Sequence, residues 1–189
     1  MIGYAFCGSF CTLSRSVRAL EELVKIGYEI LPIMSETAYS TDTRFGKAES
    51  FIKEIEEICS RRIVHTVEGA EPLGPRIPLD ALVIAPCTGN TLAKIASGIT
   101  DTAVTMAAKA HLRRDRPLLI ALSSNDAMSQ NLSNLGRLIT HRSVYFVPMV
   151  QDDPENKPHS LVAKIEKIPE CIRLMEDSRQ ARPLFLENR

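Results

Sequence analysis

The chain has 189 residues, of which 44% are hydrophobic, so it is long enough to bury one sizeable core and short for two domains. Its 23 basic and 23 acidic residues give zero net charge, which argues against nucleic acid as the main partner because phosphate binding needs a basic excess. No segment approaches the roughly 20 apolar residues of a membrane span, and the N-terminus lacks a secretory signal pattern. We therefore expect a cytoplasmic protein with one domain over residues 1–189.

Apolar runs of strand length alternate with segments whose apolar residues have helical spacing. The predicted elements, in chain order, are a strand over Ile2–Cys7, a helix over 14–26, a strand over Tyr28–Met34, a helix over 51–58, a strand over Arg62–Val67, a loop over Gly69–Pro78, a strand over Ala81–Ala85, helices over 92–96 and 103–112, a strand over Leu118–Leu122, a helix over 128–138, a strand over Val144–Val147 and a helix over 161–175.

Several boundaries have a local signal. Ser14 is predicted to cap the first helix and Gly27 to stop it, because hydroxyl side chains favour helix starts and glycine favours helix ends. Gly98 separates two helices, and Pro169 is expected either to kink the last helix or to begin a new one. The tail after Asp177 is predicted to be loosely held.

The alternation of strands and helices predicts an α/β fold, a Rossmann-like three-layer arrangement with a mainly parallel sheet. We expect about five or six strands with helices on both faces. Such sheets bind ligands in the crevice beyond the carboxyl ends of their strands. The segments that follow Cys7, Met34, Ala85 and Leu122 should therefore open onto one rim.

Two of these rim segments carry hydroxyl groups. Gly8, Ser9 and Phe10 follow the first strand, where backbone N–H groups and a hydroxyl can bind an anion at a helix start, although an ordinary strand-to-helix turn explains them about as well. No G-x-G-x-x-G dinucleotide fingerprint is present. Ser35 follows the second strand and is interpreted either as a ligand for a phosphate or ribityl hydroxyl or as a helix cap, while Glu36 leaves a ribose-binding acid as an alternative.

The third rim segment is the most informative. Pro86 is predicted to end its strand, and Gly89 to let the backbone approach a ligand. Thr88, Asn90 and Thr91 offer hydrogen bonds at a helix start. The continuation T-L-A-K-I-A-S-G-I-T-D, over residues 91–101, resembles the flavoprotein superfamily that contains cysteine decarboxylases and flavin prenyltransferases.

The resemblance implies an FMN site at the rim. The residues that we expect to contact the cofactor are Gly8, Ser9, Phe10, Ser35, Thr88, Gly89, Asn90, Thr91 and Ser123. Asn90 either caps a helix or reaches a ligand, and the asparagine of the superfamily motif at this place favours the ligand. Members of the superfamily are usually trimers or dodecamers, so the resemblance also implies a homo-oligomer.

The chain departs from both enzyme families of this superfamily at their characteristic side chains. The decarboxylase histidine would fall within residues 71–73, which contain none, and the prenyltransferase arginine would fall at about Ser123. We assign no catalytic residue. The four histidines are expected to be surface or capping residues, with His111 complementing the dipole at a helix end. Five cysteines without a C-x-x-C pair indicate reduced thiols and predict no metal site, and Cys7 is expected to be buried.

From Met1 to about Val150 the chain is similar to the B-subunit family of dipicolinate synthases. That resemblance implies a role in sporulation and a separate A subunit, which is expected to hold NADP. The two proteins together would oxidise dihydrodipicolinate, a small dicarboxylate, to dipicolinate. A stand-alone FMN-dependent decarboxylase or prenyltransferase, or a non-catalytic binding module, is the alternative.

One helical face bears on oligomerisation. Ala103, Val104, Met106 and Ala107 are small or apolar and share one side of a predicted helix. This face is expected either to contact another copy of the chain or to belong to the core.

Overall fold

The computed structural model describes residues 1–187. Its strands are β1 (Ile2–Phe6), β2 (Ile30–Met34), β3 (Ala81–Cys87), β4 (Leu118–Ser124), β5 (Val144–Phe146), β6 (Met149–Val150), β7 (Leu161–Ala163) and β8 (Phe185–Leu186). Its helices are α1 (Phe10–Lys25), α2 (Glu36–Ser40), α3 (Ala48–Cys59), α4 (Val67–Ala70), α5 (Gly89–Ser97), α6 (Ala103–Leu112), α7 (Leu132–Ile139) and α8 (Ile168–Glu176), with a 3₁₀ turn over Ile165–Lys167.

Over the described residues the sheet has eight strands, more than the five or six expected, because the C-terminal part adds the short strands β6, β7 and β8; the order is β2-β1-β3-β4-β7-β6-β8, and β5 pairs with β4 as well. The pairs among β1, β2, β3, β4 and β5 are all parallel, which confirms the predicted α/β class with a mainly parallel sheet. The edge of β4 that faces away from β3 pairs with two different strands along its length. Strand β5 pairs with residues 118–120, and β7 pairs antiparallel with residues 123–124.

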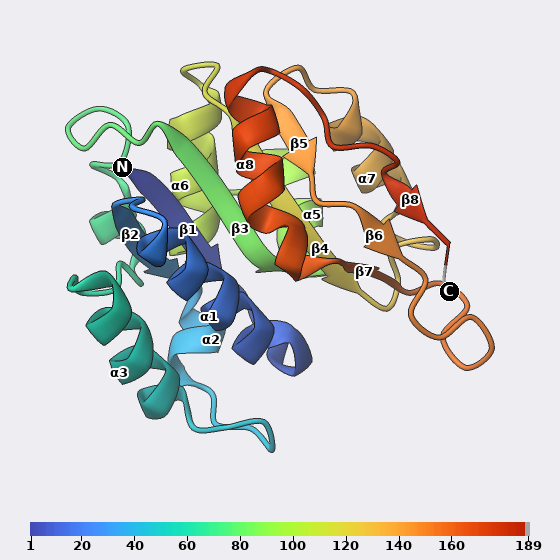
Figure 1. Ribbon diagram of the computed structural model, residues 1–189, viewed down its shortest axis with the longest axis horizontal. Helices are drawn as coiled ribbons and strands as arrows, with labels where there is room; N and C mark the ends of the chain where they lie inside the picture. The colour runs from blue at the N-terminus through green and yellow to red at the C-terminus, as the bar shows by residue number, and fades with distance from the viewer. Residues whose placement is uncertain (188–189) are drawn as a thin grey trace.

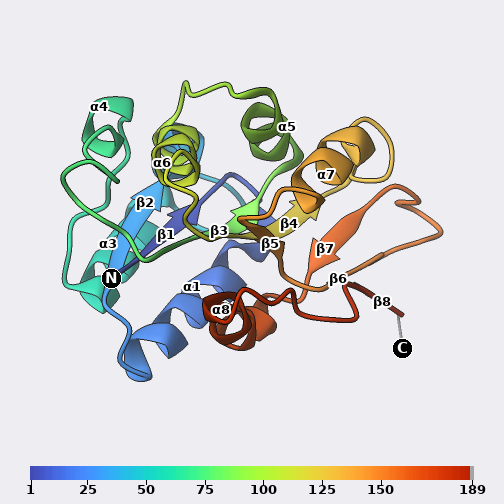
Figure 2. The same cartoon turned by 90° about the horizontal axis from the view of Figure 1, so that it is seen from above.

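Helices cover both faces of the sheet, as Figure 2 shows with α4, α5, α6 and α7 on one side and α1, α3 and α8 on the other. The strands are buried from both sides, so alternate side chains enter two separate cores. In β4, Leu119 packs toward α1 and α8, whereas Leu118 and Ile120 pack toward α6 and α7. This two-sided burial explains why the strands are continuous apolar runs.

The C-terminal part differs from the prediction. Residues 161–175 do not form one helix: Leu161–Ala163 are strand β7, and α8 begins only at Ile168. Pro169 lies in the first turn of α8, so it begins a helix and does not kink one. The tail after Asp177 is not loose over the described residues. Gln180 exchanges hydrogen bonds with the backbone of Phe146, and β8 pairs with β6.

The limits of several other elements also differ from the predicted ones. Helix α1 begins at Phe10 with Ser9 at its N-cap position, so Ser14 lies inside the helix and does not cap it. Residues 62–67 form only a single bridge, from Val64 to Ile33, and Val67 already starts α4. Residues 128–131 are turns before α7, because Asp126 and Asn131 hold them in a side-chain network. Pro86 lies within β3, where the pairing with β4 shifts register, so it does not end the strand.

The helical face of α6 belongs to the core. Ala103, Val104 and Ala107 are at most 1% exposed and pack against the sheet, so these three residues offer no surface to a second chain, and Met106 is partly buried beside them. Within residues 1–187 no helix is long and apolar enough to cross a membrane.

Candidate functional site

A cleft of about 840 Å³ lies at the carboxyl ends of the parallel strands. In Figure 1, the strands of the parallel sheet point toward the edge beyond which the loop before α3 and the loop between β6 and β7 extend. The cleft is lined by residues 8–11, 44–45, 88–90, 123–126, 152, 156–160 and 162. Three of the four predicted rim segments therefore converge on one cleft.

A cluster of hydroxyl groups forms the floor of the cleft. The Ser9 hydroxyl donates to the Ser123 hydroxyl at 2.9 Å, and the Thr12 hydroxyl lies 3.1 Å from Ser9 Oγ and 3.4 Å from Ser123 Oγ. Ser123 is 7% exposed, so the hydroxyls are held in place by their own network. The arrangement joins the end of β1 to the end of β4.

The start of α1 opens into the cleft. Ser9 occupies its N-cap position but its side chain makes no capping bond, and the first turn contains no acidic residue. The helix dipole therefore favours an anion at this point, although the Thr12 N–H of the first turn already donates to the Ser9 carbonyl at 3.1 Å. Gly8, Ser9 and Phe10 line the cleft at this point, as does Cys11.

Helix α5 is capped by Thr88. The Thr88 hydroxyl oxygen accepts from the Thr91 backbone N–H at 3.2 Å, so the cap position that we considered for Asn90 belongs to Thr88. Asn90 is exposed, lines the cleft and has no side-chain hydrogen bond among the described residues. Its amide is therefore free to meet a ligand.

Gly89 is needed for a reason that differs from the one predicted. A Cβ atom at Gly89 would come within 2.6 Å of Asn131 Nδ2 and Asp126 Oδ1, and closer still to Ser124 Oγ. These three side chains bond one another, since Ser124 and Asn131 both donate to the Asp126 carboxylate. The close approach at Gly89 that the structure contains is between α5 and the loop after β4; Gly89 also lines the cleft, so its approach to a ligand stays a prediction.

Two of the expected ligand-binding side chains do not line the cleft. The Ser35 hydroxyl accepts from Ala38 N–H and caps α2, and Ser35 is 8% exposed. Thr91 is 7% exposed and donates to Cys7 Sγ at 3.3 Å beneath the cleft. Both residues sit at the predicted edge of the sheet and act there as structural supports.

Two of the thiols near the site, those of Cys7 and Cys87, are buried and unreactive, whereas Cys11 is exposed and lines the cleft. Burial raises the pKa of the Cys7 thiol to about 11. It also raises the pKa of Cys87 well above its ordinary value, because Cys87 is completely buried and lies near Cys7. Both thiols are neutral at physiological pH and serve as small packing groups, as predicted for Cys7. No three His, Cys, Asp or Glu side chains gather as a metal site would require within the described part of the chain.

Sequence reasoning missed two walls of the cleft. Arg44 and Phe45 come from the loop before α3, and Lys157 and His159 come from the loop between β6 and β7. The loop before α3 follows a helix, so the rim rule did not select it. The loop between β6 and β7 lies beyond the predicted strand Val144–Val147, a segment that was not included among the rim segments. The one feature of the sequence that could have indicated this wall is the pair of neighbouring residues Arg44 and Phe45, a cation next to an aromatic ring.

The other histidines lie elsewhere. His111 is 2% exposed and its Nε2 bonds the Pro117 carbonyl at 2.8 Å; burial lowers its pKa to about 4. It is therefore neutral and does not complement the helix dipole, in contrast to the prediction.

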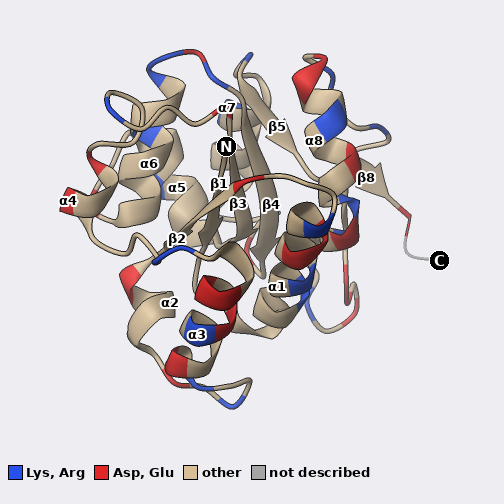
Figure 3. Ribbon diagram, turned by 60° about the vertical axis from the view of Figure 1, so that its left-hand side comes forward, with Lys and Arg blue, Asp and Glu red and all other residues tan. Residues whose placement is uncertain are grey.

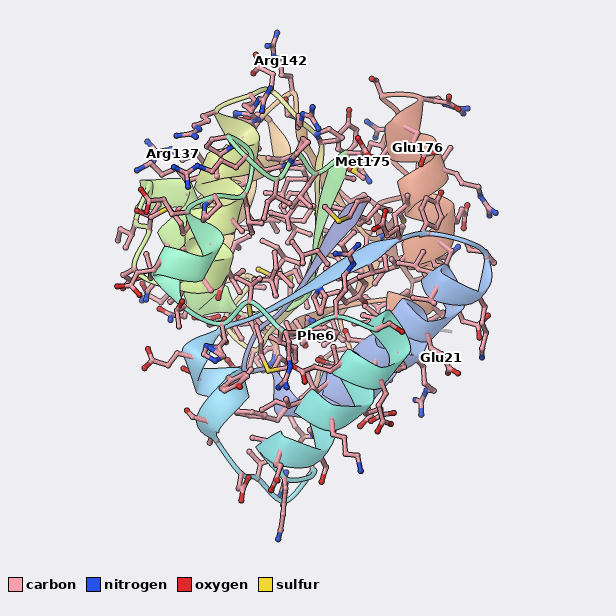
Figure 4. The ribbon with its side chains drawn as sticks, turned by 90° about the vertical axis from the view of Figure 1, so that its left-hand side faces the viewer. Phe6, Glu21, Arg137, Arg142, Met175 and Glu176 are labelled. Atoms are coloured by element: carbon pink, nitrogen blue, oxygen red, sulfur yellow. The ribbon has the colours of Figure 1, made fainter. Side chains whose placement is uncertain are left out.

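A second cavity, of about 630 Å³, lies at the amino ends of the strands, where Figure 4 places Arg142, Met175 and Glu176 far from Phe6. It lacks the helix N-termini that make the carboxyl edge suitable for anions.

Comparisons with known proteins agree with this geometry. The family model described as Flavoprotein matches residues 1–176. The B subunit of dipicolinate synthase from Bacillus subtilis (strain 168) is 42% identical over 187 residues, which cover 99% of this chain and 94% of that protein. The crystal structure of the dipicolinate synthase B subunit from Bacillus halodurans C superposes with a TM-score of 0.91 and 40% identity, covering 100% of this chain and 96% of the other.

A more distant structure shares only the fold. The FMN-dependent cysteine decarboxylase SpaF gives a TM-score of 0.67 at 21% identity, and the match covers 94% of this chain and 95% of that one. The family match, by contrast, spans most of the chain. The chain therefore belongs to the flavoprotein family, and it is similar along its whole length to the B subunit of dipicolinate synthase.

Proposed function

We propose that the chain is the B subunit of a dipicolinate synthase, which acts in the cytoplasm of a sporulating cell. It would work with a separate A subunit in the oxidation of dihydrodipicolinate to dipicolinate. The observation that carries this proposal is the 42% identity to a dipicolinate synthase B subunit over 99% of the chain. The cleft at the carboxyl edge gives that similarity a physical site, because its size suits a small ligand bound beside a cofactor.

The cleft fits the phosphate end of FMN. The open N-terminus of α1 presents N–H groups without a competing cap or acid, and the Ser9 hydroxyl lies beside them. Because a hydroxyl has a single proton, Ser9 would donate to the phosphate while the Ser123 hydroxyl turned to donate to Ser9 and hold it in place. When bound, a flavin supplies two-electron redox chemistry.

The start of α5 fits the other polar end of a ligand. The free Asn90 amide can donate to a carboxylate or to a flavin ring, and the helix N-terminus behind it favours negative charge. Because Thr88 already caps the helix, Asn90 can turn toward the ligand without loss of the cap. The NADP site is proposed to lie on the A subunit.

The same cleft is less suited to the stand-alone enzymes. By the resemblance, the prenyltransferase arginine would fall at about Ser123, whose hydroxyl is engaged with Ser9 and Thr12. The decarboxylase histidine would fall within residues 71–73, which do not line the cleft, and Leu73 is buried beside α4 and α6. A catalytic role that depends on either side chain is therefore not proposed.

We also propose that the chain forms a homo-oligomer, as members of the flavoprotein family usually do. Ala103, Val104 and Ala107 are buried within one chain, so they cannot contact a second copy. Light scattering tests this directly: a mass well above 21.0 kDa supports the proposal, and a mass near 21.0 kDa refutes it.

The test of the proposed function is reconstitution. The purified A subunit, the purified chain, and their mixture are each supplied with freshly prepared dihydrodipicolinate, NADP and FMN, and dipicolinate is quantified by chromatography. We expect the mixture to form dipicolinate much faster than either protein alone. Equal rates with and without the chain would contradict the proposal. Visible absorbance of the chain after FMN addition and gel filtration reports separately whether it retains flavin.

A further inference from the structure

One turn at the cleft presents an exposed aromatic ring beside an unpaired cation. Phe45 is 44% exposed, although large hydrophobic side chains are usually buried. The Arg44 guanidinium lies 4.9 Å from the centre of the Phe45 ring, and Arg44 forms no ion pair with any residue in 1–187. Both residues line the cleft. Figure 3 shows basic residues on the extended turn that precedes α3.

The turn is rigid even though it is exposed. Thr43 and Gly46 exchange backbone hydrogen bonds of 3.0 and 3.1 Å, and the Phe45 N–H donates to the Thr43 hydroxyl at 3.2 Å. Gly46 has a φ of 147°, and a Cβ there would come within 2.7 Å of the Phe51 ring. Asp42 accepts from the Ala48 N–H at 2.9 Å and ties the turn to α3. A turn held in this way loses little entropy when it binds a ligand.

The two side chains together suit one kind of ligand. A guanidinium binds a carboxylate through two parallel hydrogen bonds, and an aromatic face stacks on a flat ring. We propose that Arg44 and Phe45 recognise a planar ring that bears a carboxylate, as the specificity element of the cleft. This inference rests on the proposed function, because dihydrodipicolinate and dipicolinate are rings that carry two carboxylates.

The opposite wall offers a second cation. Lys157 comes from the loop between β6 and β7, and its Nζ lies 3.4 Å from Asp152 Oδ2. That loop is docked on the neighbouring segment, since the Met128 N–H donates to the His159 carbonyl at 2.9 Å. Lys157 lines the same cleft as Arg44. Because Asp152 lines the cleft as well, Lys157 would exchange this ion pair for the second carboxylate of the ligand, which makes a dicarboxylate preferable to a monocarboxylate.

Calorimetric titration of the FMN-loaded chain tests the proposal. The probes are dipicolinate, picolinate, which has the same ring and one carboxylate, and glutarate, which has two carboxylates and no ring. The variants are Arg44→Gln, Phe45→Ala and Lys157→Gln. The matched controls lie outside the cleft and are Arg18→Gln, the exposed Phe185→Ala and Lys53→Gln. Melting curves verify that each variant folds.

We expect Arg44→Gln to weaken dipicolinate binding about tenfold or more, because a charged hydrogen bond is lost. Phe45→Ala should weaken dipicolinate and picolinate about threefold to tenfold and leave glutarate unchanged, since only stacking is lost. Lys157→Gln should reduce the preference for dipicolinate over picolinate. The three controls should bind within about twofold of wild type, which is the range of surface substitutions.

The outcomes separate this inference from the proposed function. If the Arg44 and Phe45 variants bind dipicolinate as wild type does, the inference is wrong, while dipicolinate formation in the reconstituted mixture still supports the function. If wild type binds no dipicolinate, the inference is also wrong. If, in addition, the mixture of the two proteins forms no dipicolinate, the proposed function fails too.

Discussion

The Ser9 hydroxyl donates a hydrogen bond of 2.9 Å to the Ser123 hydroxyl, although 114 residues separate them. Strand β3 lies between β1 and β4 in the sheet, so this bond crosses the end of β3. The contact is possible because parallel strands all end at the same edge. It makes the carboxyl edge a single polar surface rather than a set of separate loops.

Ser9→Ala is expected to weaken FMN binding about tenfold, because a hydrogen bond to a charged phosphate is lost. The melting temperature should also fall by a few degrees, because the nearly buried hydroxyls of Ser123 and Thr12 lose the Ser9 hydroxyl as a partner. Ser14→Ala is the control, since Ser14 is an exposed residue of the same helix that does not line the cleft. Flavin titration by fluorescence measures the effect, and equal affinities for the two variants would count against a phosphate site here.

Asn90 and Thr88 are predicted to have separable effects. Thr88→Ala removes the cap of α5, which should cost about 1 kcal/mol and lower the melting temperature by roughly 2–4 °C. Asn90→Ala should leave the melting temperature unchanged and reduce ligand affinity, or activity in the reconstituted mixture, by about one order of magnitude. Melting curves and titrations on both variants provide the comparison. A lowered melting point with unchanged affinity in Asn90→Ala would show that Asn90 has a structural role.

Gly89→Ala is expected to destabilise the protein by about 1–3 kcal/mol, because its methyl group would collide with the Asp126, Ser124 and Asn131 network. Gly136→Ala is the control: Gly136 is an exposed position within α7, and nothing lies within 4 Å of a Cβ there. That variant should be more stable than wild type by about 0.5–1 kcal/mol. Urea unfolding measures both. Equal free energies of unfolding for Gly89→Ala and Gly136→Ala would mean that the Ser124, Asp126 and Asn131 side chains can shift away from the added methyl group at little cost.

His111 makes the stability of the fold depend on pH. Burial lowers its pKa from 6.5 to about 4, so between these values the unfolded chain binds more protons than the folded one. The contribution of neutral His111 to the free energy of unfolding is fully present above pH 6.5. It is lost as the pH falls toward 4, and the total loss is about 3 kcal/mol.

The test compares His111→Gln with wild type. Unfolding free energies are measured by urea from pH 7.5 to about 4.5, the range in which the buried imidazole must be protonated on unfolding. The glutamine keeps a donor for the Pro117 carbonyl but does not titrate, so the difference between the two proteins should shrink as the pH falls. His159→Gln, at an exposed position, should track wild type; a constant difference for His111→Gln would refute the linkage.

The sequence predicted the parallel part of the fold well, because strands such as Ala81–Cys87 are buried on both faces and appear as unbroken apolar runs. The elements in the last third of the chain were predicted less well. Leu161–Ala163 is too short for its period to distinguish a strand from a helix, and its pairing with residues 123–124 is not local. A tail that pairs as β8 likewise leaves little trace in sequence.

The site was predicted only where a residue directly follows a strand. Ser9, Asn90 and Ser123 were found in this way, and all three line the cleft. Arg44 was missed, because its loop reaches the cleft through a turn whose shape depends on Gly46 and Phe51. Ser35 was assigned to the cleft because serine at a strand end looks the same whether it caps a helix or binds a ligand.

The most direct measurement is the rate of dipicolinate formation by a constant amount of the A subunit when increasing amounts of this chain are added. We expect the rate to rise and saturate with the wild-type chain and with Lys53→Gln, whose side chain is on α3 outside the cleft. With Asn90→Ala we expect a clearly lower plateau, or a need for far more protein. A rate that does not depend on the chain, or that is identical for wild type and Asn90→Ala, would contradict this expectation.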